Sequence, residues 1–138
     1  MLAILPLSNG YKILGFLHIL SVVAAFGPLF IYPSMQRTGA GAAVAKLHLR
    51  LSLPATVLVW VFGMGLIGAS DDNFAMSDGY IVASLAIWVV LVAVSWFLIR
   101  PSLADSSDAA RSKLAAGIGV THLLMVVALY LMVFKPGW

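Results

Sequence analysis

The chain of 138 residues contains no cysteine and no glutamate, and only 9% of its residues are charged. Without cysteine it can form no disulfide, thiolate site, iron–sulfur cluster or Cys-based zinc site. Soluble domains usually contain about 25% charged residues, so the composition excludes an ordinary soluble domain. Hydrophobic residues make up 62% of the chain instead. This balance predicts a single integral membrane domain.

The few charged residues avoid four long stretches of the sequence, which are residues 13–36, 51–70, 79–99 and 114–134. About 20 apolar residues cross a bilayer as a helix, and a helix satisfies its own backbone there. The stretches are too long for barrel strands and lack their alternation. We therefore expect an all-α, four-helix transmembrane bundle, up-down-up-down, with spans of about 13–34, 50–70, 79–99 and 114–134.

Six of the eight basic residues flank the first and third connections, and only Lys12 and Lys135 fall on the other side. Because basic loops stay in the cytoplasm, we predict a multi-pass cell-membrane protein with both termini extracytoplasmic. This charge bias explains the net charge of +3 without a nucleic-acid partner. Residues 34–46 and 100–113 are expected to be loops, the first of them mobile. Residues 1–10 are expected to be an interfacial lead-in, not a cleavable signal peptide.

Several residues predict how the spans bend and pack. Pro28 lies mid-span and should interrupt the first helix, since proline removes a backbone hydrogen bond. Small residues four apart, Gly65 with Ala69 and Ala115 with Gly119, are typical of helix–helix contact faces in lipid.

The aromatic residues suggest further positions. Tyr32 and Trp96 fall where an interfacial aromatic belt is expected at the cytoplasmic side. Trp60 and Trp88 lie near the middle of their spans, where an indole N–H needs a partner. They either pack in the core or form the wall of a cofactor site.

Three histidines are the candidates for chemistry, because no carboxylate or lysine lies inside a span. His18 and His122 each follow a glycine, Gly15 and Gly119, by three residues. That glycine lies one turn back on the same face and leaves room for a helix or a flat ring. Neutral imidazole is a common axial ligand of haem iron. These four residues therefore form a candidate haem b site, with His18 as the candidate ligand of the iron.

The alternative is structural: each histidine bonds a backbone carbonyl or a hydroxyl of a neighbouring helix. The predicted depths of His18 and His122 differ by about 9 Å at 1.5 Å per residue, which favours one histidine as the sole ligand over a pair. His48 lies between Lys46 and Arg50, so we expect an interfacial or a phosphate-facing side chain there.

The first span, with Leu17-His18-Ile19 and the ending Gly-x-Leu-x-x-Tyr-Pro, resembles that of the HemJ-type protoporphyrinogen oxidases, in a group that includes the CopD-like domains. The basic entry, Pro-Ala step and Trp-x-Phe-Gly segment of residues 47–68 are also similar, as is the Lys135-Pro136 ending. The resemblance implies a small multi-helix membrane protein that oxidises protoporphyrinogen IX toward the quinone pool. It also implies a role for His18 in binding haem b.

The chain departs from this pattern, because its third span has neither lysine nor histidine and the chain has no glutamate. These departures, the small size and the small-residue faces favour a non-enzymatic accessory or assembly subunit of a larger, plausibly respiratory, membrane complex. Its partners would be the lipid bilayer and other membrane subunits. The alternative function is a HemJ-type redox protein with haem b. Copper handling fits poorly, because soft copper sites need clustered sulfur ligands.

Overall fold

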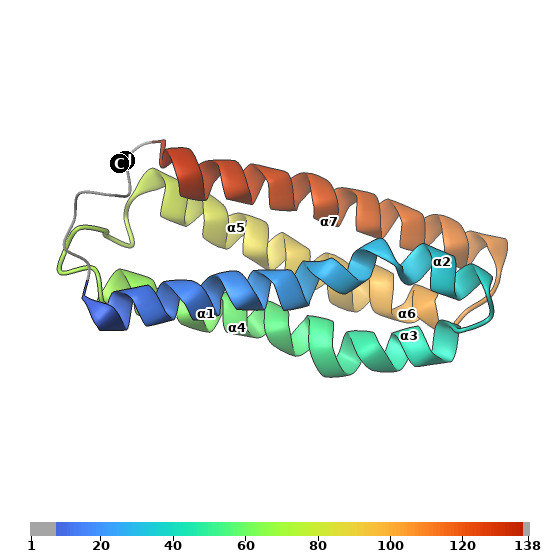
Figure 1. Cartoon of the computed structure of the whole chain (residues 1–138). Helices are drawn as coiled ribbons and strands as arrows, with labels where there is room; N and C mark the ends of the chain where they lie inside the picture. Colours follow the sequence, from blue (N-terminus) through green and yellow to red (C-terminus); the bar gives the residue numbers. More distant parts are fainter. Residues whose placement is uncertain (1–7, 137–138) are drawn as a thin grey trace.

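The computed structural model describes residues 8–136, and this part of the chain is helical and contains no strand. Four helical rods, shown in Figure 1, are each long and apolar enough to cross a membrane. They cover Asn9–Arg37, Gly41–Gly68, Gly79–Leu103 and Asp108–Phe134. The all-α prediction is confirmed, and the architecture suits a multi-pass membrane protein. Most of the predicted lead-in, residues 1–7, lies outside the described residues.

Three of the four rods are interrupted by a turn of non-α helix. The first rod consists of α1 (Asn9–Phe26), the 3₁₀ turn η1 (Gly27–Phe30) and α2 (Tyr32–Arg37). The second consists of α3 (Gly41–Leu47), the π-helical turn η2 (His48–Ser52) and α4 (Leu53–Gly68). The third consists of α5 (Gly79–Val94), the π-helical turn η3 (Ser95–Ile99) and α6 (Arg100–Leu103). The fourth is the single helix α7 (Asp108–Phe134).

The interruption of the first rod lies where the sequence places Pro28. The ring of a proline clashes with the carbonyl four residues earlier, and proline has no N–H to donate. The chain responds with the 3₁₀ turn η1, which begins at Gly27. Figure 1 shows that the rod bends there, so that α2 lies nearer to α7 than α1 does. The predicted break at Pro28 is confirmed.

One end of the bundle carries two short connections, residues 38–40 and 104–107, and we call it the basic end. Its six basic residues are Arg37, Lys46, Arg50, Arg100, Arg111 and Lys113. The predicted loops at 34–46 and 100–113 are wrong, because most of both stretches is helical. Helices can continue past the hydrocarbon into the headgroup layer, so charged residues do not mark where they end.

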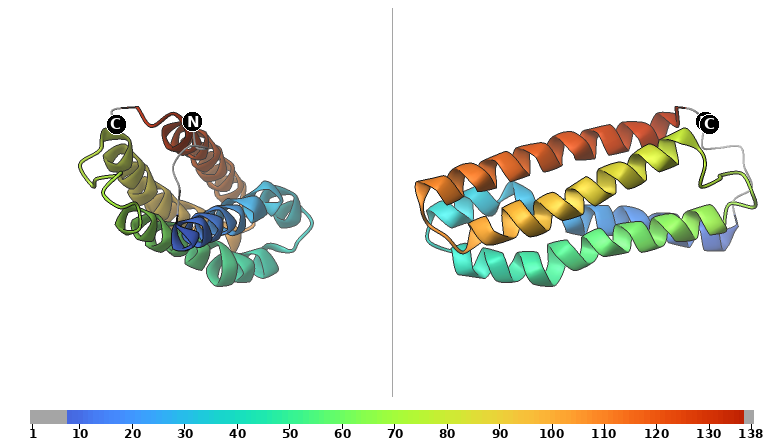
Figure 2. Two further views of the ribbon diagram at one scale, coloured as in Figure 1. Left: turned by 60° about the vertical axis from the view of Figure 1, so that its left-hand side comes forward. Right: turned by 180° about the vertical axis from the view of Figure 1, so that it is seen from behind.

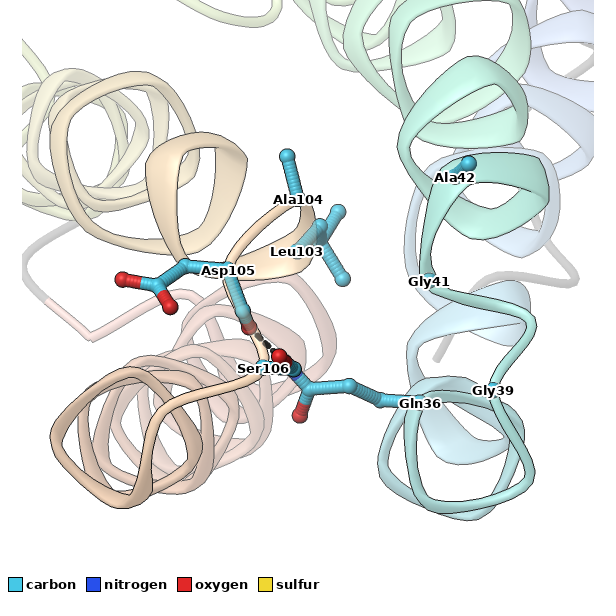
Figure 3. Close-up of a pocket in the computed structure, with 8 residues that line it drawn as sticks. All are labelled: Gln36, Gly39, Gly41, Ala42, Leu103, Ala104, Asp105 and Ser106. Atoms are coloured by element: carbon cyan, nitrogen blue, oxygen red, sulfur yellow. Dashed lines mark hydrogen bonds between the residues drawn. The ribbon is translucent and has the colours of Figure 1, made fainter.

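The two connections of the basic end are tied together. The Gln36 amide Nε2 donates hydrogen bonds to the carbonyl oxygens of Ser102 (2.8 Å) and Asp105 (3.1 Å). Figure 3 shows Gln36 reaching from the first rod across to the turn at Asp105. Gly41 lies so close to α6 that an added Cβ would be 2.7 Å from the Leu103 carbonyl oxygen. Glycine at position 41 therefore allows α3 to approach α6 this closely.

The fourth rod begins with an N-terminal cap. The Ser107 hydroxyl accepts a hydrogen bond from the Ala110 N–H (3.1 Å), and Asp108 occupies the first turn, where the helix dipole favours negative charge. The Ser107 N–H donates to Asp105 (2.9 Å) and lowers the pKa of the Asp105 carboxyl.

The rods associate mainly as two pairs, α1 with α4 and α5 with α7, as Figure 2 shows from two directions. Glycine allows the close approach: a Cβ at Gly65 would be 3.2 Å from Leu14, and one at Gly117 would be 2.9 Å from Ile99. Gly119 has nothing within 4 Å of an added Cβ. The face through Ala115 and Gly119 is therefore exposed and makes no helix contact within the described part of this chain. The buried face of α7 follows the helical period through Leu114, Gly117, Ile118 and Thr121.

Candidate functional site

Four buried polar side chains meet near the basic end of the bundle, and we call them the buried cluster. They are Tyr32, His48, Ser52 and Ser95, which are 0%, 1%, 1% and 7% exposed. They come from α2, η2 and η3, so the buried cluster connects three of the four rods. A buried polar group in an apolar medium requires hydrogen-bond partners, and these four groups provide them for one another.

The distances define a chain of hydrogen bonds. The Tyr32 hydroxyl lies 2.7 Å from the Ser52 hydroxyl and 3.2 Å from His48 Nδ1. On the other side of the ring, His48 Nε2 lies 2.9 Å from Ser95 Oγ and 3.4 Å from the Ser95 carbonyl oxygen. A carbonyl only accepts, so both contacts of Nε2 are used when Nε2 carries the proton. Nδ1 then accepts from Tyr32, and Tyr32 accepts from Ser52.

The two π-helical turns place His48 and Ser95 opposite each other. His48 is the first residue of η2 and Ser95 the first of η3, and each lies six residues before a proline, Pro54 and Pro101. A proline clashes with the carbonyl four residues earlier, which here belongs to the π-helical turn. A π turn closes over five residues, since the Leu53 N–H donates to the His48 carbonyl. The wider turn gives the proline ring the space that an α turn denies it.

Two predictions about the buried cluster are wrong. His48 was expected to be an interfacial or a phosphate-facing side chain, and Tyr32 to belong to an interfacial belt, yet both side chains are fully buried. The reason for His48 is helical geometry: two residues are about 200° apart around a helix, so His48 faces inward on the same side as the buried Val44, whereas Lys46 and Arg50 are exposed. His48 and Ser95 each lie six residues before a proline, Pro54 and Pro101. This shared spacing is the sequence signal that could have drawn attention to both residues.

A serine hydroxyl beside an imidazole nitrogen is also the arrangement of a nucleophile and its base. Here the Ser95 hydroxyl is buried, and neither Ser95 nor His48 lines the two pockets described below. Among the described residues, the hydrogen bonds of the His48 ring go to Tyr32 and Ser95 and none to a carboxylate, so the buried cluster connects three rods.

His18, the predicted iron ligand, lies in the contact between α1 and α4. Its Nδ1 is 2.9 Å from the Val59 carbonyl oxygen, so Nδ1 carries the proton and donates it. Its ring lies against Gly63, where an added Cβ would be 3.3 Å from Cε1. Gly15 faces Leu66 at 3.9 Å. The space beside Gly15 is therefore occupied by α4. A neighbouring helix was one of the two occupants expected from the sequence, the other being a flat ring.

His122 has a different environment. Its ring stacks on Phe30, with centroids 4.1 Å apart and planes 19° from parallel. Its Nε2 is buried and has no hydrogen-bond partner among the described residues. Gly119, one turn back, opens on free space. The predicted open space at Gly119, one turn before His122, is therefore present, but Nε2 of His122 is buried.

The structure does not bring the two candidate ligands together. His122 stacks on Phe30, and Phe30 follows His18 by twelve residues along the same rod. At 1.5 Å per residue this separates the two histidines by about 18 Å along the bundle, which is twice the separation expected from the sequence. One iron cannot bind both. The described residues also contain no group of three or more side chains able to hold a metal ion.

The two mid-span tryptophans contact each other. The rings of Trp60 and Trp88 stack with centroids 5.9 Å apart, and the Trp88 N–H donates to the Thr56 carbonyl oxygen (2.8 Å). The partner that the indole of Trp88 was expected to need is therefore a carbonyl of α4. This contact joins α4 to α5.

The two pockets both lie at the basic end. One, of about 150 Å³, lies between the two short connections and includes Gln36, Gly41 and Asp105. The other, of about 370 Å³, lies between α3 with η2 on one side and α6 on the other. Neither contains His18 or His122.

Comparison of the chain with protein-family models, with curated proteins and with solved structures finds no match.

Proposed function

We propose that this protein is a non-enzymatic accessory or assembly subunit that packs against a larger membrane complex, with a respiratory complex as the first candidate. The observation that carries the proposal is how little of each rod the chain itself covers. Only 17–22% of the residues in the most apolar window of each rod are buried. Helices associate in lipid through close packing and hydrogen bonds, so loosely covered rods leave faces for other helices.

The polar side chains support the same function. Within the spans, His18 and Trp88 donate hydrogen bonds to backbone carbonyl oxygens of the same chain, those of Val59 and Thr56. A transporter or a redox enzyme would direct such groups into a cavity or a pathway. Here they hold rods together, which is what a scaffold requires.

Photocrosslinking in native membranes tests this proposal. A photoreactive residue replaces Val23 on α1 or Val126 on α7, which are 61% and 59% exposed, and Leu114, which is buried, serves as the control. We expect one exposed position to give an adduct of constant mass with one membrane protein, whose deletion lowers the level of this chain. Adducts with lipid alone at both exposed positions, and a chain that migrates as a monomer in mild detergent, would reject it.

The HemJ-type function remains a second proposal because of one observation at His18. The hydrogen bond from Nδ1 to Val59 fixes the ring, and Nε2 makes no hydrogen bond among the described residues. Histidines that bind metals usually donate the other nitrogen in this way. Haem bound there would provide one-electron chemistry, and His18 would hold its iron.

A reduced-minus-oxidised visible spectrum of the purified protein separates the two proposals. The redox function requires a b-type α-band that His18→Ala abolishes and that His122→Ala preserves. The absence of this band from wild-type protein purified with haem in excess would reject it, and the crosslinking result would be unaffected.

The proposed orientation, with the basic end in the cytoplasm and both termini outside, follows from the charge bias. Because the chain has no cysteine, single cysteines at the exposed Ser77 and Ser106 report it directly. A membrane-impermeant maleimide should label Ser77→Cys in intact cells and Ser106→Cys only after permeabilisation. The reverse labelling would invert the orientation.

A further inference from the structure

The larger pocket of the basic end is a groove with one charged and several apolar residues. It has a volume of about 370 Å³, and its lining residues are Ala45, Leu49, Arg100, Pro101 and Ala104. Leu49 is 42% exposed, so the groove opens on the outside of the bundle. The groove is thus placed where a lipid molecule can reach it.

Arg100 is held in position without an acidic partner. Its guanidinium lies 4.1 Å above the Trp96 ring, one turn deeper in the rod. The ion pair among the described residues joins Arg111 to Asp108 and does not involve Arg100. The N–H donors of a guanidinium lie in its own plane, so contact of the Arg100 guanidinium with the Trp96 ring does not use them and they can bind an anion.

The charge of the basic end favours an anionic ligand. Six basic residues and two acidic residues, Asp105 and Asp108, give this end a formal net charge of +4. Arg50 and Lys46 follow the groove residues Leu49 and Ala45 directly in sequence, and both are exposed. Asp105 is the nearest acidic residue in sequence, and its carboxylate accepts the Ser107 N–H.

The depth of Arg100 matches the position of lipid phosphates. The third rod is free of charge from Gly79 to Ile99, which is 21 residues. At 1.5 Å per residue this stretch is about 31 Å long, close to the ~30 Å hydrocarbon thickness of a bilayer. Arg100 is the next residue, so it lies at the boundary between hydrocarbon and headgroups.

We propose that this groove binds one anionic phospholipid, whose phosphate is held by Arg100 and whose acyl chain lies against Leu49 and Trp96. Basic pockets between transmembrane helices are suited to such headgroups. The combination of a free guanidinium, an apolar wall and a position at the headgroup boundary selects a lipid over a soluble anion. The proposal does not depend on the proposed function.

Native mass spectrometry of the detergent-purified chain tests the groove. With phosphatidylglycerol and phosphatidylcholine in equal amounts, we expect one retained phosphatidylglycerol. Arg100→Gln should weaken its binding about five- to tenfold, because each basic residue near the surface contributes about 1 kcal/mol. Ala104→Trp, which fills the groove without changing the charge, should weaken it as well. Arg111→Gln removes one charge outside the groove and is the matched control.

Three results would overturn the proposal. Equal loss in Arg100→Gln and Arg111→Gln would mean general attraction to the basic end. Equal retention of phosphatidylcholine would remove the anionic selectivity. Displacement of the lipid by millimolar inorganic phosphate would identify a site for the soluble anion. Far-UV circular dichroism confirms first that each variant is folded.

Discussion

Tyr32→Phe is the most direct test of the buried cluster, because it removes one hydroxyl and keeps the ring. The hydroxyl makes two contacts, at 2.7 Å to Ser52 and at 3.2 Å to His48. Interhelical hydrogen bonds in a membrane contribute about 0.6 kcal/mol on average and up to about 1.7 kcal/mol. The shorter bond has good geometry and the longer is near the limit, so their direct loss should cost about 1 kcal/mol.

The groups left behind add to this cost by different amounts. The Ser52 hydroxyl can turn to a carbonyl of its own helix, so it regains a partner. Nδ1 of the buried His48 ring has no such local partner, and an unsatisfied buried group costs about 1–3 kcal/mol. We therefore expect Tyr32→Phe to lower the free energy of unfolding by about 2 kcal/mol, which is roughly a 30-fold change in the equilibrium constant.

Unfolding in mixed micelles, followed by far-UV circular dichroism as the fraction of denaturing detergent rises, measures this change. Tyr130→Phe is the control, because Tyr130 is 53% exposed and should stay within about 0.5 kcal/mol of wild type. Ser52→Ala and the double variant complete a cycle whose coupling should be at least about 0.6 kcal/mol. Equal stability of Tyr32→Phe and Tyr130→Phe would refute the stabilising role of the buried cluster.

The same titration tests three packing contacts. Gly41→Ala should destabilise by about 1–3 kcal/mol, because its Cβ would lie 2.7 Å from a backbone carbonyl oxygen of α6, which cannot move alone. Gly117→Ala should cost about 1 kcal/mol, because the atoms near its added Cβ belong to side chains that can move. Gly119→Ala should cost nothing or stabilise slightly, because no atom lies within 4 Å of its added Cβ. Equal effects of the two variants would contradict the orientation of α7. Trp88→Phe should cost about 1 kcal/mol by removing the indole hydrogen bond to the Thr56 carbonyl, which still accepts a bond within its own helix, and an unchanged midpoint would mean that this bond contributes nothing.

The sequence predicts the rods well because the membrane imposes a simple rule. An uncharged stretch of 20 or more residues must be helical in lipid. The first, third and fourth predicted spans lie within their rods, and the second rod ends at Gly68, two residues before the predicted end. The interruption at Pro28 was also predictable, since it follows from the geometry of one residue. The ends of the rods were not predictable, because an uncharged stretch indicates which residues lie in the hydrocarbon layer and does not indicate where the helix ends. Helical residues at the basic end therefore looked like loops.

The sites were harder to predict because they depend on contacts between distant residues. For His18, the sequence offered a carbonyl of a neighbouring helix as one alternative, and the hydrogen bond to Val59 is that contact. For His48, its charged neighbours pointed to the surface, while its partners lie 16 and 47 residues away. The shared spacing of His48 and Ser95 before a proline is a hint in the sequence, but it does not say that the two residues are partners or that Tyr32 joins them.

The paired π turns have a consequence for the alignment of related sequences. A π turn is an α turn with one residue more, and one extra residue rotates everything beyond it by about 100°. The second and third rods both contain this insertion, at the positions where His48 meets Ser95. If one rod alone lost the extra residue, the part of that rod beyond the π turn would be rotated by about 100° relative to its neighbour. Relatives should therefore keep both extra residues or lack both, which would appear as two single-residue gaps that always occur together.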